Sequence, residues 1–165
     1  MAYSEDDTRV KLIDPQIHDA GWKEEYLLRN YSISDDRFYV EGEEYKRLPT
    51  ALFADYVLIY QSVTVAVLEA KAEDEDPMKH MKQVQDYAKR LDVPFAYIAN
   101  GKTTFLYDRR TTKAPQEVSS FLSPEEMFKA YVEWKGLEDK NLSALEYPLH
   151  ISGTKRPRAY QETAI

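Results

Sequence analysis

The chain has 165 residues, a net charge of −7 at pH 7 and no cysteine. This length suffices for one well-filled core and is too short for two. The absence of cysteine excludes disulfides, zinc–thiolate sites and cysteine nucleophiles. The acidic balance counts against strong autonomous binding to nucleic acid, because non-specific affinity comes mainly from neutralising phosphates. No segment approaches the roughly 18 apolar residues of a membrane span, and the N-terminus lacks the apolar core of a signal peptide, so we expect a cytoplasmic protein with no membrane partner.

A helix is predicted at the start of the chain. Ser4 is typical of an N-cap, apolar side chains recur at helical spacing over residues 10–20, and Gly21 is a natural C-terminal stop. Pro15 lies inside this pattern. It either kinks the helix or restarts it with Asp14 as the new cap.

Two neighbouring strands follow, over residues 54–60 (ADYVLIY) and 63–72 (VTVAVLEAKA), both rich in β-branched or aromatic residues. Ahead of them, residues 31–47 mix aromatic, polar and acidic side chains, which we interpret as a poorly defined hairpin. The acidic segment 72–76 is then predicted to turn into a helix over residues 78–91, with an apolar stripe along one side.

A second hairpin is predicted over residues 94–108, where two apolar runs flank Asn100-Gly101. That pair supplies the positive φ angles of a type I′ turn. Residues 109–123 read as a loop, and Ser123 followed by proline is a strong start for a last helix ending near residue 134. Residues 136–157 look irregular. The order of elements predicts an α/β fold, a mixed central β-sheet flanked by α-helices.

Three ionisable residues lie on the two central strands, where side chains should be buried: Asp55, Glu69 and Lys71. Glu69 and Lys71 share one face because side chains alternate along a strand. Asp55 lies opposite Glu69 only if the connection between the strands has odd length or contains a bulge. A two-residue turn with regular pairing would instead align Asp55 with Leu68. In the first case Val57, Ile59, Val65 and Val67 share the face of the three charged residues.

Two carboxylates at cross-strand distance repel one another unless a positive charge lies between them. Mg²⁺ is the natural candidate, since it takes oxygen ligands and retains several waters, and Mn²⁺ is a possible substitute. The pattern therefore suggests a metal site for phosphodiester hydrolysis, in which Lys71 orients a water or stabilises developing charge. An alternative with about equal support is a buried salt-bridge triad in which Lys71 simply pairs with both acids.

Gln83 and Tyr87 lie four residues apart on the helix that follows, and therefore on the same helical face, beside its apolar stripe. An amide and a phenol placed there would contact a phosphate or hold the lysine. The plainer interpretation is a solvated glutamine and a half-buried tyrosine.

Together, Asp55, Glu69-Ala70-Lys71 and the Gln83…Tyr87 element resemble the PD-(D/E)XK nuclease pattern with its downstream Q-x-x-x-Y motif. With the flanking segments 7–22, 83–109 and 156–165, nearly the whole chain resembles the N-terminal region of the restriction (R) subunit of type I restriction-modification enzymes. Ala54 stands where the proline of the pattern is found in other members. The resemblance implies a restriction-endonuclease-like fold and a Mg²⁺-dependent DNA endonuclease.

By the same resemblance, Asp55 and Glu69 are metal ligands, with the Ala70 backbone carbonyl as a third and Glu5 of the first helix as a further candidate. Lys71 is the catalytic lysine, and Gln83 and Tyr87 support DNA binding and site geometry. The implied partners are DNA and the methylation (M) and specificity (S) subunits of an ATP-driven translocating complex that cleaves unmethylated DNA.

The resemblance divides the chain into a nuclease domain over residues 1–150 and a segment over 151–165. That segment is a linker with the first residues of a superfamily 2 motor, in which Gln161 would read the adenine of ATP. No phosphate-binding loop follows it, so ATP is expected to bind only to the full-length subunit. Two alternatives stay open: a catalytically silent docking or structural domain of the same complex, and a stand-alone repair nuclease of the same fold.

Overall fold

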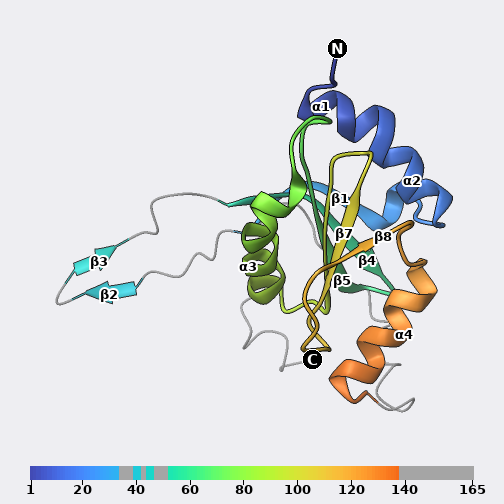
Figure 1. The fold of residues 1–165 in the computed structure, drawn as a ribbon. Helices are drawn as coiled ribbons and strands as arrows, with labels where there is room; N and C mark the ends of the chain where they lie inside the picture. Colours follow the sequence, from blue (N-terminus) through green and yellow to red (C-terminus); the bar gives the residue numbers. More distant parts are fainter. Residues whose placement is uncertain (34–38, 42–43, 47–51, 138–165) are drawn as a thin grey trace.

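The computed structural model describes residues 1–33, 39–41, 44–46 and 52–137. Its centre is a six-stranded sheet with the strand order β1-β4-β5-β6-β7-β8 (Figure 1). The strands span Leu27–Ser32 (β1), Phe53–Tyr60 (β4), Val63–Ala70 (β5), Phe95–Ala99 (β6), Thr104–Asp108 (β7) and Gln116–Val118 (β8). A separate two-stranded sheet pairs Tyr39–Glu41 (β2) with Glu44–Lys46 (β3), within the segment where a hairpin was predicted.

The sheet is mixed, as the sequence predicts. β5 and β6 run parallel, and every other neighbouring pair is antiparallel. The parallel pair is joined by the crossover element α3 (Met81–Leu91), which a short 3₁₀ turn, η3 (Pro77–His80), precedes. The predicted start of this helix at residue 78 is therefore too early, because Asp76 caps the 3₁₀ turn and the regular helix begins at Met81.

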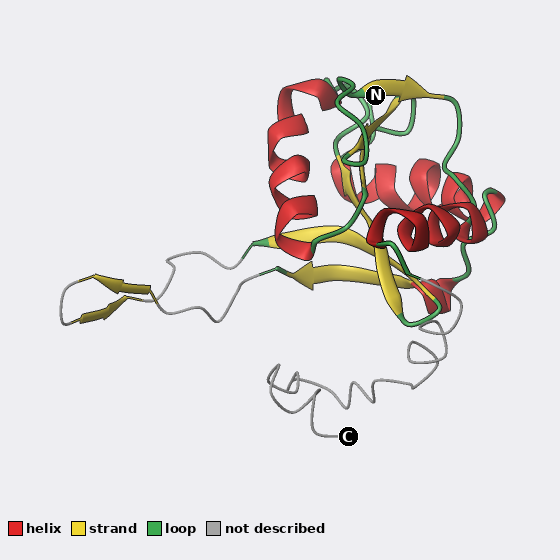
Figure 2. Cartoon of the chain, turned by 90° about the horizontal axis from the view of Figure 1, so that it is seen from below, coloured by secondary structure: helices red, strands yellow, loops and turns green. Residues whose placement is uncertain are grey.

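Helices cover both faces of the sheet (Figure 2). On one face, α3 packs Val84 and Ala88 against Val57, Val67 and Ile98 of the central strands. On the other, the N-terminal helical segment and α4 (Pro124–Lys135) cover a second core. That core is formed by buried side chains of the sheet and of these helices, among them Ile13, Ile17, Tyr56, Leu68, Phe95 and Met127. Both faces of β4 and β5 are thus buried, which confirms that these strands are central.

The N-terminal helical segment changes its winding twice, from α1 (Glu5–Thr8) through one π turn, η1 (Arg9–Ile13), to α2 (Asp14–Asp19). The Asp14 N–H donates to the Arg9 carbonyl, five residues back. Pro15 explains the wide turn, since its ring would clash with the carbonyl four residues earlier in a regular α-helix. The helix restarts at Asp14, but Ile13 is its N-cap. The predicted capping role of Asp14 is therefore wrong.

The turn between β4 and β5 decides where the acidic residues lie. Gln61 and Ser62 both adopt positive φ angles, 50° and 64°, and close a two-residue turn of the primed type. A bulge then inserts Val65 between the pairs Leu58↔Ala66 and Ile59↔Thr64. The bulge moves the register by one residue, so that Tyr56 pairs with Leu68. This is the second of the two arrangements that the sequence allowed.

The bulge also changes which apolar side chains share the face of Asp55 and Glu69, and the prediction for this face is wrong at one position. Val65 joins Ala66 in the core on the side of the N-terminal helices, whereas Val57 and Val67 pack against α3. Val65 therefore does not share the face of the charged residues, because the extra residue reverses the alternation of side chains on its far side.

The connection between β6 and β7 is not the predicted type I′ turn. Only Gly101 of the pair has a positive φ, 84°, and the connection runs over residues 100–103. The Asn100 carboxamide oxygen accepts hydrogen bonds from the backbone N–H groups of Lys102 and Thr103. Its amide nitrogen donates to the Glu73 and Glu75 carbonyls. Asn100 thus fastens the loop after β5 to this turn.

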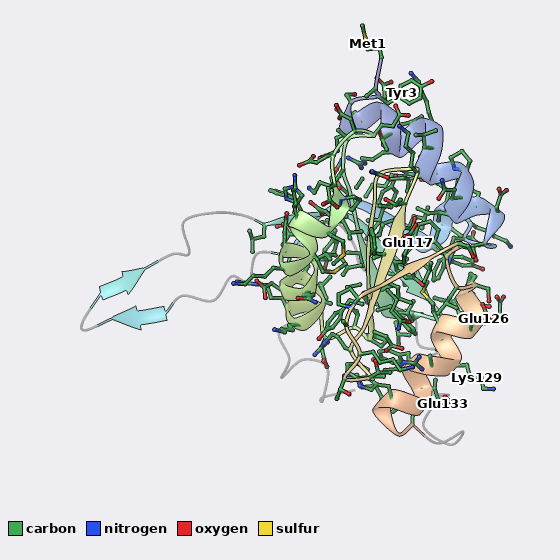
Figure 3. All side chains as sticks on the ribbon, viewed as in Figure 1. Met1, Tyr3, Glu117, Glu126, Lys129 and Glu133 are labelled. Atoms are coloured by element: carbon green, nitrogen blue, oxygen red, sulfur yellow. The ribbon has the colours of Figure 1, made fainter. Side chains whose placement is uncertain are left out.

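The last helix is placed as predicted. Ser123 and Glu126 form a reciprocal capping box at its start, and Gly136 ends it in the left-handed conformation. Glu126, Lys129 and Glu133 lie on its exposed side (Figure 3). Two strands were missed: β1 begins before the segment where the hairpin was expected, and β8 lies in the predicted loop over 109–123. In the described residues, no helix has the length and hydrophobicity to cross a membrane.

Candidate active site

Asp55 and Glu69 are brought together by the bulged register of β4 and β5. Continued by one residue from the pair Tyr56↔Leu68, that register sets Asp55 opposite Glu69. The Asp55 carboxylate oxygen Oδ2 accepts a hydrogen bond of 2.8 Å from the Ala70 N–H. The two acids therefore lie on one side of the sheet, as the sequence argument required.

Glu69 is buried, with 5% of its surface exposed. Its Oε1 atom accepts from Lys71 Nζ and from Gln83 Nε2, each at 3.1 Å. Its Oε2 atom has no hydrogen-bond partner among the described residues, although it is buried. Burial, followed by repulsion from Asp55, raises the pKa of Glu69 to about 7, and Lys71 opposes the rise. The Oε2 atom of Glu69 therefore has free acceptor capacity, and a positive charge close to it would stabilise the ionised form of the side chain.

Lys71 lies just beyond the end of β5, with 8% of its surface exposed. Its ammonium also stands 3.7 Å from Glu5 Oε2. Burial alone would lower the pKa of Lys71, but Glu69, Glu5 and Asp55 together outweigh it, and the pKa lies above its usual value. The side chain is therefore a cation at neutral pH. The predicted salt bridge with both strand acids forms only in part, because the contacts are with Glu69 and Glu5.

Gln83 and Tyr87 support Glu69 from α3. Gln83 Nε2 donates to the Tyr87 hydroxyl at 2.7 Å as well as to Glu69. Tyr87 is 4% exposed and belongs to the core under α3. It therefore lies within the apolar stripe of the helix, not beside it as predicted. Gln83 holds the acid and not the lysine.

Two residues of the site were missed in the sequence. Arg9 Nη1 lies 3.3 Å from Asp55 Oδ1 and donates to Asn30 Oδ1 at 3.1 Å. Asn30 lies opposite Asp55 in the register of β1 and β4, and its φ of 49° is left-handed. One signal was available for Arg9: it follows Glu5 by four residues, so both point from the same helical face.

The carboxylates of Asp55 and Glu69 suit a hard divalent cation, most of whose ligands would be water molecules and substrate oxygens. The fit rests on two adjacent carboxylates and on the buried, unpartnered Oε2 of Glu69. In the described part of the chain, no group of three or more His, Asp and Glu side chains is arranged to hold a metal ion unaided. Glu5 contacts Lys71 in this arrangement, and the roles of Glu5 and of the Ala70 carbonyl as ligands stay predictions.

Comparison with known proteins gives a consistent result. The chain is 33% identical over 172 residues to the endonuclease subunit of the EcoAI type I restriction enzyme of Escherichia coli, with 98% of this chain and 21% of the relative covered. A solved fragment assigned as an HsdR subunit of a type I restriction enzyme from Vibrio vulnificus YJ016 is 31% identical, with a TM-score of 0.74. That match covers 98% of this chain and 31% of the solved one. Both of these similar proteins are subunits of type I restriction enzymes by their names. No protein-family model matches the chain.

The predicted α/β fold is confirmed by the similarity to the solved fragment. The chain spans about a fifth of the curated relative and about a third of the solved chain. The proposed boundary at residue 150 and the motor-like segment with Gln161 lie outside the described residues.

Proposed function

We propose that the chain is a Mg²⁺-dependent DNA endonuclease module of the PD-(D/E)XK type, working within a type I restriction complex. The observation that carries the proposal is the convergence of Asp55, Glu69 and Lys71 at one end of β4 and β5, with one oxygen of Glu69 buried and unpartnered. The similarity to endonuclease subunits over 98% of the chain supports the same reaction class.

Each side chain has a role that follows from its contacts. Asp55 and Glu69 would hold the cation, with Asp55 oriented by the Ala70 N–H and Glu69 by Gln83. The bound cation would supply electrostatic stabilisation to the phosphoryl oxygens. Lys71 stays protonated beside Glu69, which suits it to stabilise negative charge as a phosphodiester is attacked by water, and makes it a poor general base.

The remainder of the activity would belong to the assembled enzyme. The M and S subunits would recognise the DNA and its methylation, and the motor domains of the full-length subunit would bind ATP and translocate DNA. This division agrees with the net charge of −7, since the isolated chain has little capacity to neutralise a DNA backbone.

The test is Mg²⁺-dependent cleavage of unmodified target DNA by the full-length subunit with its M and S partners and ATP. Lys71→Met and Asp55→Asn should each lower the cleavage rate by roughly 100-fold or more while ATP hydrolysis continues. Lys129→Met is the matched control, because Lys129 lies exposed on α4 (Figure 3), which covers the face of the sheet opposite to α3. Cleavage at the normal rate by either site variant would refute the assignment.

A catalytically silent docking domain is the second candidate. The observation in its favour is that both acids already have basic partners, Arg9 for Asp55 and Lys71 for Glu69. Calorimetric titration with Mn²⁺ separates the two. Binding that is lost in Asp55→Asn supports the nuclease, and no binding in the unmodified protein supports docking.

A further inference from the structure

Arg9 occupies an unusual position for a helix arginine, since only 12% of its side chain is exposed. Its Nη1 atom contacts Asp55 of β4 and Asn30 of β1, and lies 3.8 Å from the exposed Asp6 of its own helical segment. The neighbouring basic residue of the same segment, Lys11, is half-exposed, forms an ion pair with Asp7 four residues back and lies over the ring of Tyr3. Arg9 is therefore directed at the site, whereas Lys11 makes an ordinary surface ion pair.

Arg9 packs over the ring of Tyr56, a buried side chain that is itself held by a hydrogen bond. Its guanidinium lies 5.3 Å from the centre of the Tyr56 ring, on which Arg29 also lies at 5.0 Å. The Tyr56 hydroxyl donates to Asp14 at 2.7 Å, and Asp14 in turn accepts from Arg29 at 3.1 Å. Arginine over an aromatic face is held both by its charge and by stacking.

The contacts of Asp55 give Arg9 a role toward a cation. One oxygen of Asp55 is bound by the Ala70 N–H at 2.8 Å, and the other faces Arg9 at 3.3 Å. Neither oxygen is free, in contrast to Oε2 of Glu69. A divalent ion held by Asp55 and Glu69 would therefore lie close to the guanidinium and meet a like charge, so that binding favours a weakening of the contact between Arg9 and Asp55.

We propose that Arg9 is a positioning residue that acts as an internal counter-ion: it holds Asp55 in place without metal and yields this carboxylate to the entering divalent cation. The inference rests on the proposed nuclease function. Its consequence is that Arg9 keeps metal affinity low and keeps the acids arranged while the site is without an ion.

Calorimetric titration of the chain with Mn²⁺ tests the exchange. Arg9→Met preserves the apolar stem over Tyr56 but removes the charge, and it should bind Mn²⁺ about tenfold more tightly, because a repelling charge is gone. Arg9→Lys retains the charge and should stay within about threefold of the unmodified protein. Lys11→Met, the control on the same segment, should leave the affinity unchanged. Unchanged or weaker binding by Arg9→Met would overturn the inference.

A second measurement needs no metal. Thermal unfolding in EDTA is followed for Arg9→Met, Asp55→Asn and the double variant. Arg9→Met should lower the Tm by about 2–4 °C when Asp55 is present, and by clearly less in the Asp55→Asn background, as expected for a coupled pair. Equal losses in both backgrounds would show that Arg9 does not hold Asp55.

The combined results separate this inference from the function on which it rests. If the unmodified protein binds Mn²⁺ through Asp55 and Arg9→Met binds no more tightly, the exchange is wrong and the metal site stands. If the unmodified protein binds no Mn²⁺, both the metal site and the exchange are refuted, and coupling in EDTA would then describe a structural ion pair only.

Discussion

Glu69 should make the metal-free protein lose stability as the pH rises. Its pKa lies at about 7 in the folded chain, against an ordinary value of 4.5, because burial and Asp55 disfavour the charged form. Between these two values the folded state keeps a proton that the unfolded state has released. The free energy of unfolding therefore falls with rising pH, by about 1.4 kcal/mol for each pH unit from this group alone. The stabilisation is complete below pH 4.5 and is lost once the pH exceeds about 7.

Glu69→Gln measures this contribution directly, because glutamine keeps the shape and an acceptor oxygen but does not titrate. The difference in unfolding free energy between the variant and the unmodified protein should move in favour of the variant by up to about 3 kcal/mol between pH 4.5 and pH 8. Urea unfolding in EDTA at several pH values gives the difference, in which the titration of all other groups largely cancels.

Glu117→Gln is the matched control, because Glu117 is exposed on the edge strand β8 (Figure 3). Its unfolding free energy should follow that of the unmodified protein at every pH. Parallel curves for Glu69→Gln and the unmodified protein would refute the reasoning, because they would mean that Glu69 ionises as easily in the fold as in water.

Three further predictions concern single contacts that stabilise the fold. Gly101→Ala should destabilise the protein by roughly 1–3 kcal/mol in urea unfolding, because its φ is 84° and a Cβ atom would lie 2.5 Å from the Leu12 Cβ. Ser123→Ala should cost about 1 kcal/mol by removing half of the capping box of α4, and Ser123→Thr should restore most of it. Tyr56→Phe should cost about 1 kcal/mol through its lost bond to Asp14, with no change of secondary structure by circular dichroism.

The central hairpin shows what could be predicted from the sequence and what could not. The apolar runs fix β4 and β5, and the need to place Asp55 opposite Glu69 limits the connection to an odd length or a bulge. The choice between these two depends on Gln61 and Ser62 adopting left-handed angles, which neither residue type favours.

Asn100 shows the opposite case, in which a strong local signal is overruled. Asn-Gly is typical of a type I′ turn, but the Asn100 side chain holds the backbone of Glu73 and Glu75. Those partners lie 25 to 27 residues earlier in the chain. Contacts so distant in sequence cannot be inferred from local propensity.

The missed strands and Arg9 escaped prediction for two different reasons. β1 and β8 carry few buried side chains, with β8 entirely exposed or half-exposed, so that apolar alternation is weak at these edges of the sheet. The pairing of Arg9 with Asp55 depends on how a helix packs on the sheet, which spacing along the chain does not reveal. Asp55, Glu69, Lys71 and Gln83 could be predicted from the sequence, because they interrupt strongly apolar or helical patterns.

The extra residue at Val65 makes the site unusually sensitive to chain length. Removing one residue there would restore regular pairing across the hairpin, and Asp55 would face Leu68 instead of its acidic neighbour. No charged group would be altered, and the strands would still be hydrophobic enough to fold. Insertions and deletions in this hairpin should therefore be tolerated far less than substitutions, although the turn itself carries none of the chemistry.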